Sequence, residues 1–342
     1  MKKSVSILMT LTLVLTLFAV PVMAETESSD KTAIGYLSYL NMSEGDALLS
    51  RETEIPAFDY LEKQGVYESV GRNVSNRTMV PYDSLDAMLM GLTSGEVDYI
   101  DVPDSTARYL CRANDQVKQA VLYHPEKVEG FSQELVDRLS NGYSFMMLEE
   151  NSDLRDQFDQ VIAEMKEDGT LDELIKTHIT DVAESGEPAA VTFEEFEGEP
   201  IKVAVTGSLP PMDYVAADGS FAGFNTAILA EIGKRLEKNI ELVQVDSIGR
   251  ALALAQGNVD VSFWTRARSE GSIADDTQLM SKEEKRAYFQ KKAESHTDEE
   301  NNLMKNVYGS LPREVFRNRD MPEGTVVTAP YYTDLNVLVA LK

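Results

Sequence analysis

Two stretches of sequence decide the fold: DSLDAMLMGLTSGEVDYIDV (Asp83–Val102) and DSIGRALALAQGNVDVSFW (Asp246–Trp264). Each opens with Asp-Ser, a typical helix N-cap, and continues with apolar residues at helical spacing. Each then breaks at a glycine, Gly95 or Gly257, and resumes with Val-Asp before an apolar strand. A helix-strand unit repeated about 162 residues apart predicts an α/β protein with two lobes, each a mostly parallel sheet flanked by helices.

The rest of the chain is organised around these two units. We expect a first α/β part over residues 25–150, its terminal helices over 151–181, and a second α/β part over 200–342. Residues 182–199 are acidic and contain proline and glycine, which is typical of a solvated linker. We interpret the aspartates of the two Val-Asp pairs, Asp98 and Asp260, as structural residues at the start of strands rather than catalytic acids.

Residues 1–24 are typical of a secretory signal peptide. Lys2 and Lys3 precede an uncharged, largely apolar run from Val5 to Val22, and Val22-Met23-Ala24 offers a small-residue cleavage site. The alternative is an uncleaved membrane anchor, because the apolar run is almost long enough to span a bilayer. No cysteine follows the run, so we expect no lipid anchor and a product that is periplasmic or extracellular.

Composition excludes several classes of function. The 342 residues carry a formal net charge of −26, which disfavours binding to nucleic acid. With a single cysteine, Cys111, and three histidines, neither a disulfide framework nor a metal or cofactor site is expected. The chain also lacks a Gly-x-Ser-x-Gly elbow, a His-Glu-x-x-His motif and a glycine-rich phosphate loop. We therefore do not expect an enzyme.

Three segments resemble the extracellular solute-binding proteins of family 3, which deliver polar amino acids to ABC transporters. Ile201–Ser247 follows the opening of the family's first lobe, with a strand, a Pro-Pro-x-x-aromatic loop, an Asp-Gly hairpin and a Gly-Phe-Asn helix start. Ala329–Lys342 is similar to the Pro-Tyr strand that leaves that lobe. Phe145–Ile179 resembles the return strand and terminal helices. The resemblance implies a two-lobed periplasmic-binding-protein-like fold.

The order of these segments is reversed relative to the family, because the part like lobe two precedes the part like lobe one. The simplest interpretation is a circular permutation in which the acidic linker joins the family's end to its beginning. The alternative is two incomplete copies that pair with other chains. Since the two parts supply one lobe of each kind, we favour a complete, monomeric binder.

The resemblance also implies which residues face a ligand between the lobes. Family members stack an aromatic side chain on the solute and clamp its carboxylate with an arginine. In this chain Ser272 stands at the position of that arginine, and Pro103 stands at the position of the amine-binding aspartate. We therefore take arginines and aspartates near these two positions as the candidates. The candidate ligand-binding residues are Met212, Asp213, Tyr214, Trp264, Thr265, Arg266, Arg268, Tyr36, Ser38, Asn41, Asp101 and Asp104.

The expected function is therefore reversible binding of a small polar solute, amino-acid-like or related, for import through an ABC transporter permease. The lobes would close on the ligand by a hinge motion. A sensory or adaptor protein that uses the same cleft without transport is the alternative. A secreted dehydratase or lyase on the same fold is a further, less favoured, alternative.

Overall fold

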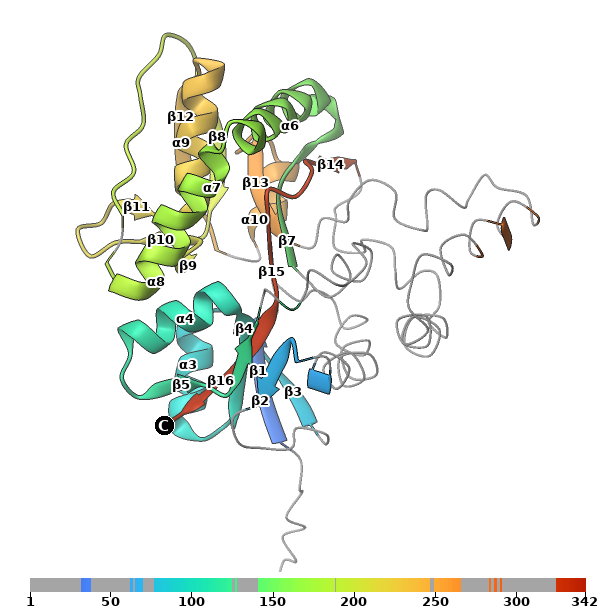
Figure 1. Cartoon of the computed structure of the whole chain (residues 1–342). Coiled ribbons are helices and arrows are strands. Elements are labelled where there is room, and N and C mark those ends of the chain that lie inside the picture. The colour runs from blue at the N-terminus through green and yellow to red at the C-terminus, as the bar shows by residue number, and fades with distance from the viewer. Residues whose placement is uncertain are drawn as a thin grey trace, which may run out of the picture. The chain divides into compact units, whose positions relative to one another are not determined.

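The computed structural model describes residues 32–37, 62–63, 65–69, 77–124, 127, 141–187, 189–246, 249–265, 283, 286–287, 290 and 324–342. It contains two main sheets with helices beside them (Figure 1), which confirms the predicted α/β class. The proposed leader and the candidates Ser38, Asn41, Arg266 and Arg268 lie outside the described residues.

The first sheet has the strand order β3-β1-β4-β16-β5. Its three parallel strands are β1 (Thr32–Leu37), β3 (Arg77–Tyr82) and β4 (Tyr99–Pro103). The strands β16 (Asn336–Leu341) and β5 (Val117–Gln119) continue it in antiparallel pairing. Helices α3 (Leu85–Ser94) and α4 (Asp104–Ala113) belong to the same lobe, here called the first lobe, as does the β2–β6 pair (Tyr67–Ser69 and Val121–Tyr123).

The second sheet has the order β12-β8-β13-β7-β14, and we call the lobe around it the second lobe. The strands β8 (Ile201–Val205), β12 (Ile240–Gln244) and β13 (Val261–Thr265) pair in parallel. Strand β7 (Asn141–Leu148) pairs antiparallel with β13, and β14 (Thr325–Val327) and β15 (Tyr332–Asp334) each pair antiparallel with β7. Its helices are α6 (Ser152–Glu167), α7 (Thr170–Ile175), α9 (Phe224–Leu236) and α10 (Gly249–Ala255). The remaining elements are η2 (Glu149–Asn151), η3 (Lys176–Thr180), α8 (Asp181–Ser185), β9 (Ser208–Leu209), β10 (Asp213–Val215) and β11 (Phe221–Ala222).

Each sheet thus has a parallel core of three strands, as predicted, and a single strand of opposite direction, β16 in the first sheet and β7 in the second. The strands β5, β14 and β15 pair with that reversed strand and therefore run in the direction of the core, so both sheets are mostly parallel. The antiparallel neighbour of each parallel core comes from the other half of the chain. In Figure 1 the green strand β7 lies beside the orange β13, and the red strand β16 lies beside β4. The strands β7 and β16 each leave one half of the chain and pair in the sheet that is built from the other half.

The internal repeat is confirmed in detail. In the first lobe Ala33 N donates to Asp98 Oδ2 at 2.9 Å, and Asp98 N donates to Ala33 O at 2.8 Å. In the second lobe the Lys202 backbone and Asp260 form the same two hydrogen bonds, also at 2.9 and 2.8 Å. Asp98 and Asp260 are therefore structural residues that join the start of one parallel strand to its neighbour.

The two repeated helices also begin and end alike. Ser84 accepts a hydrogen bond from Ala87 N at the start of α3, and Asp246 accepts one from Gly249 N at the start of α10. After each helix a glycine takes a positive φ, 78° at Gly95 and 68° at Gly257, which a side chain would strain. Both repeats therefore have a side-chain acceptor at the helix start and a glycine stop at the helix end.

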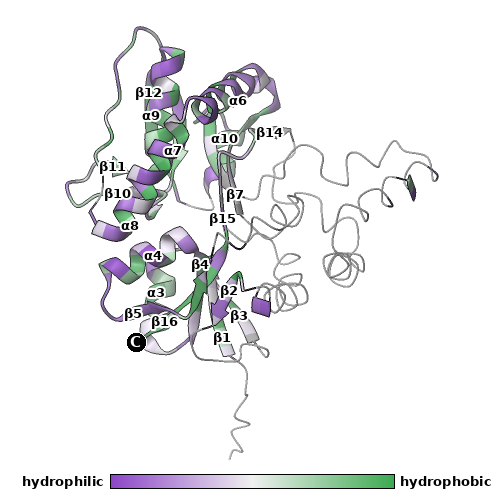
Figure 2. Ribbon diagram, viewed as in Figure 1, coloured by the Kyte–Doolittle hydropathy of each residue, from purple (hydrophilic) through white to green (hydrophobic). Residues whose placement is uncertain are grey.

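Aromatic residues of the core pack around the crossing strand β7. Phe145 is fully buried and its ring centroid lies 4.8 Å from that of Tyr331 and 5.3 Å from that of Phe158. In Figure 2 the visible side of helix α6 is mostly hydrophilic. Its residues Phe158 and Ile162 are buried in the second lobe. Within the part of the chain that the structure describes, no helix has the length and apolar character needed to cross a membrane.

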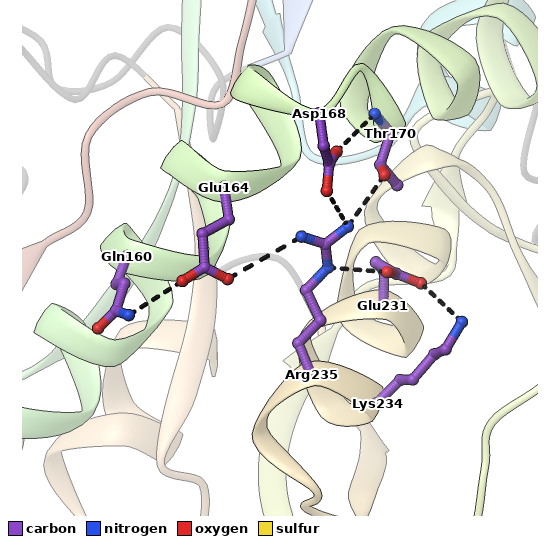
Figure 3. Close-up of polar contacts among 7 residues, drawn as sticks. All are labelled: Gln160, Glu164, Asp168, Thr170, Glu231, Lys234 and Arg235. Atoms are coloured by element: carbon purple, nitrogen blue, oxygen red, sulfur yellow. Dashed lines mark hydrogen bonds and ion pairs between the residues drawn. The ribbon is translucent and has the colours of Figure 1, made fainter.

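Arg235 joins helices from the two halves of the chain (Figure 3). Its guanidinium contacts Asp168 Oδ2 and Glu231 Oε1, each at 2.8 Å, and donates to Thr170 Oγ1 at 2.9 Å. Hydrogen bonds from Thr170, followed by Arg235, lower the pKa of Asp168 to about 2. Arg235 on α9 therefore fixes the end of α6 and the start of α7 to the second lobe.

We expect Asp98→Ala and Asp260→Ala to destabilise the protein by similar amounts, about 1 kcal/mol each, because each removes the acceptor for one backbone N–H at a strand start. The free energy of unfolding measured by denaturant titration checks this. Asp115→Ala, which changes an exposed aspartate in a turn, is the matched control and should leave stability unchanged. A much larger effect at one of the two aspartates would contradict their equivalence.

We expect Arg235→Ala to lower the thermal midpoint by roughly 2 to 4 °C, because three side-chain partners on α7, α9 and the α6–α7 turn lose their shared donor. The control is Lys234→Ala on the same helix, whose contact with Glu231 is 3.7 Å long. The difference between the two variants should shrink in 1 M salt, where the Debye length is about 3 Å. Equal midpoints for both variants in low salt would refute the role of Arg235.

Candidate functional site

The Pro-Pro loop places its three candidates in different surroundings. Met212 is fully buried in the hydrophobic core. Asp213 is also buried, and its carboxylate accepts hydrogen bonds from Thr206 N at 2.7 Å, Thr206 Oγ1 at 2.9 Å and Gly207 N at 3.2 Å. Burial raises the pKa of Asp213, although these donors oppose the shift. Asp213 therefore stabilises the turn after β8. Because Tyr214 is the next residue, the same hydrogen bonds also help to position Tyr214.

Tyr214 contacts the other lobe. Its ring centroid lies 5.9 Å from that of Tyr109 on α4, and the two rings are tilted by 46°. Burial raises the pKa of Tyr214, and its hydroxyl oxygen has no hydrogen-bond partner among the described residues. Aromatic residues from the two lobes therefore contact each other at this point. The buried hydroxyl of Tyr214 is available to bond a further polar group.

A small pocket lies in the first lobe beside the start of α4. Asp104 is 4% exposed, and its carboxylate accepts a hydrogen bond from Gln119 Nε2 at 2.9 Å and contacts Arg108 Nε at 2.9 Å. Burial raises the pKa of Asp104, whereas Arg108 and Gln119 lower it. The Arg108 side chain is 44% exposed. The residues that line this pocket of about 100 Å³ are Asp104, Arg108, Gln119, Leu122 and Tyr123.

Two further candidates lie side by side in neighbouring parallel strands, Tyr36 near the carboxyl end of β1 and Asp101 in the middle of β4. Tyr36 in β1 is paired in register with Asp101 in β4, and both residues are buried. Ligands of open α/β sheets bind outside the carboxyl ends of the strands. The structure therefore brings Tyr36, Asp101 and Asp104 to the same edge of the first sheet.

The end of β13 is described by its backbone only. Trp264 pairs with Ser144 and Thr265 with Tyr143, both on the crossing strand β7. Both candidates therefore stand at the carboxyl end of a parallel strand in the second sheet, at the positions equivalent to Val102 and Pro103 in the first. Their ligand contacts stay a prediction.

The described residues contain no group of three or more histidine, cysteine, aspartate or glutamate side chains arranged to hold a metal ion. The polar groups of the pocket are instead one carboxylate, one guanidinium, one amide and one phenol. Such a set suits hydrogen bonding and ion pairing to a small polar molecule.

Residues 201–305 match the family of bacterial extracellular solute-binding proteins, family 3. The family resemblance is confirmed over this segment. It covers the second lobe from β8 through β13, including the Pro-Pro loop and Tyr214. No curated protein sequence matches the chain.

Several solved structures of solute-binding proteins are similar to this chain at low identity. The GluR0 ligand-binding core complexed with L-glutamate has 10% identity and a TM-score of 0.34, with 92% of this chain and 86% of that chain covered. A periplasmic binding protein from Brucella ovis with glutathione bound has 10% identity and a TM-score of 0.36, with coverage of 91% and 62%. A putative L-cystine ABC transporter protein from Listeria monocytogenes has 11% identity and a TM-score of 0.33, with coverage of 91% and 83%.

Sequence reasoning did not identify the partners of Asp104. Arg108 follows it by four residues, a spacing that predicts an ion pair once the helix start is known. Tyr109 lies on the same helix, and no motif marks it. Gln119 reaches Asp104 only because β5 is held beside β16, and no local pattern signals that pairing.

We expect Asp213→Ala to reduce the free energy of unfolding by about 2 to 4 kcal/mol, because three donors of the buried turn would lose their acceptor. Thr206→Val is the matched partial change, since it removes one donor and keeps both backbone N–H bonds. Its cost should be less than half as large in denaturant titrations. Wild-type stability for Asp213→Ala would contradict the structural role of this carboxylate.

Proposed function

We propose that this chain is a secreted solute-binding protein that closes its two lobes on a small polar solute. The observation that carries the proposal is the pocket in which a buried carboxylate, Asp104, lies beside the half-exposed guanidinium of Arg108. An acceptor and a donor of opposite charge in one pocket are suited to a ligand that presents both kinds of group. The family match over residues 201–305 supports the same function.

The chemistry of the pocket favours an amino-acid-like or related solute. The carboxylate of Asp104 can accept from an ammonium or hydroxyl group, and Arg108 can donate to a carboxylate or carbonyl. Leu122 and Tyr123 form its less polar wall. Because Gln119 already donates to Asp104, a bound cation would share that carboxylate with two existing donors. Weak or moderate affinity is the expected consequence.

The other candidates complete the proposed cleft. Tyr109 and Tyr214 come from different lobes and contact each other, so a solute bound between the lobes would meet both rings. The Tyr214 hydroxyl has no hydrogen-bond partner among the described residues, which supports a hydrogen bond from this group to the ligand. Tyr36, Asp101, Trp264 and Thr265 stand in parallel strands whose carboxyl ends face such a cleft in α/β folds.

We further propose that the chain is a circular permutation of the family's order. Support comes from α6 and α7, which contact α9 in the second lobe although they follow the first part in sequence. The linker that would join the old ends is anchored to the same lobe, since Asn239 Nδ2 donates to Phe196 O at 2.6 Å. Such a permutation produces this order of elements: a return strand, terminal helices, a linker and then the first strand.

Import through an ABC transporter permease is the proposed physiological role, with the protein secreted by its leader and acting as a monomer without cofactor or catalysis. Solute uptake in cells that lack the protein tests this role. Lost uptake would support import. Unchanged uptake with a lost transcriptional response to the solute would favour the sensory alternative.

A thermal-shift titration with amino acids, polyamines, sugars and organic acids tests binding itself. At a hundredfold excess over Kd, binding adds about 2.7 kcal/mol and should raise the midpoint by roughly 5 to 10 °C for the responding class. Arg108→Ala should weaken that binding about 10- to 100-fold, because a charge-assisted hydrogen bond is lost.

Lys118→Ala is the matched control, since it removes a neighbouring exposed cation on β5 that does not line the pocket. It should bind as the wild type does. No midpoint shift with any class would count against a free solute binder. A shift that Arg108→Ala leaves intact would keep the binder and move its ligand away from this pocket.

A further inference from the structure

Asp334 occupies the point where the chain crosses from the second sheet to the first. It ends β15, which pairs with β7 in the second sheet, and β16 starts at Asn336 in the first. The side chain is fully enclosed at 5% exposure. No function described above uses this carboxyl.

Two hydrogen bonds tie this crossing to the first turn of α4. Ser105 N donates to Asp334 Oδ2 at 3.0 Å, and Asp104 N donates to Leu335 O at 2.9 Å. Helix α4 starts after Pro103 with no side-chain cap of its own. Asp334 therefore caps α4 from a distant part of the chain and holds the crossing strand to the helix that carries Asp104.

The surroundings of Asp334 disfavour its negative charge. Desolvation by burial, and next the carboxylate of Asp104, raise the pKa of Asp334 to about 7, while Ser105 and Arg108 oppose the shift. The titratable and charged groups around it on the neighbouring elements are Asp104 and Arg108 of α4, Tyr67 of β2 and Tyr332 of β15, with Asp101 of β4 and Tyr123 of β6 acting on those tyrosines. Only Arg108 among them is positive, and it is already paired with Asp104.

We propose that Asp334 is a pH-sensitive link between the crossing strand and helix α4, closed when the carboxyl is protonated and weakened when it ionises. The protonated carboxyl keeps an oxygen that accepts from Ser105 N and is not repelled by Asp104. The ionised carboxylate accepts a stronger hydrogen bond from Ser105 N, but it brings a second negative charge into a buried site beside Asp104, and the cost of burying that charge outweighs the stronger bond. The junction between the lobes therefore loosens as the pH rises through neutrality.

The sign of the effect follows from linkage. The unfolded chain binds the Asp334 proton with a pKa near 4, whereas the folded chain holds it until about pH 7. Between these values the folded state binds more protons, so this group's contribution to stability falls as the pH rises. Above pH 7 the full cost of the buried charge is present.

The test compares the thermal midpoints of the wild type and Asp334→Asn from pH 5 to pH 8. Asparagine keeps an acceptor for Ser105 N and cannot ionise, so the midpoint of the variant minus that of the wild type should increase by roughly 5 °C over this range. Asp218→Asn, in an exposed turn where Ser220 donors lower the aspartate pKa, is the control and should show no such trend.

Hydrogen exchange locates the effect, and it needs no ligand. After correction for intrinsic rates, exchange in segments 99–113 and 329–342 should accelerate above pH 7 in the wild type and not in Asp334→Asn. A midpoint difference that stays constant with pH would overturn the proposal. Accelerated exchange of both segments in Asp334→Asn at every pH would also overturn it, because a cap would then be lost rather than a charge.

Discussion

The fold depends on the antiparallel pairing of β7 with β15 at the point where both strands pass between the lobes. Asn141–Tyr143 lie opposite Tyr332–Asp334, and from there β7 continues into the second sheet while β16 continues into the first. Neither sheet is complete without a strand from the other half of the chain. Both sheets therefore depend on strand pairs between residues that are distant in sequence.

The parts of the fold that depend on local pattern could be predicted from the sequence. The Asp-Ser caps, the glycine stops and the Val-Asp strand starts act within a few residues of themselves, and the repeat of Asp98 at Asp260 reproduces the same pair of backbone hydrogen bonds. At the start of α10 Asp246 accepts a hydrogen bond from the backbone N–H three residues on, as Ser84 does at the start of α3.

The strand exchange and the pocket could not be predicted in this way. Sequence order places Asn141–Leu148 with the first part, and only pairing with β13 assigns it to the second sheet. Asp104 was expected as a ligand contact, but its partner Gln119 arrives through β5, whose position depends on β16 from the far end of the chain. Long-range pairing carries no periodic signal, so a side chain that reaches a site through it is invisible in local sequence.

The same crossing also explains why charge gathers at the start of α4. The first turn of a helix favours negative groups, and here Asp104 lies in that turn while Asp334 accepts from Ser105 N. The carboxylate of Asp104 is paired with Arg108. The negative charge of Asp334 is disfavoured by burial and by Asp104, and it is favoured by the hydrogen bonds of Ser105 and by Arg108. Asp104 lines the pocket proposed to bind a solute, and its backbone N–H donates to Leu335 O in the segment that joins the two sheets. Under the proposed function, a solute group bound at Asp104 would therefore change the electrostatic field at Asp334 as well.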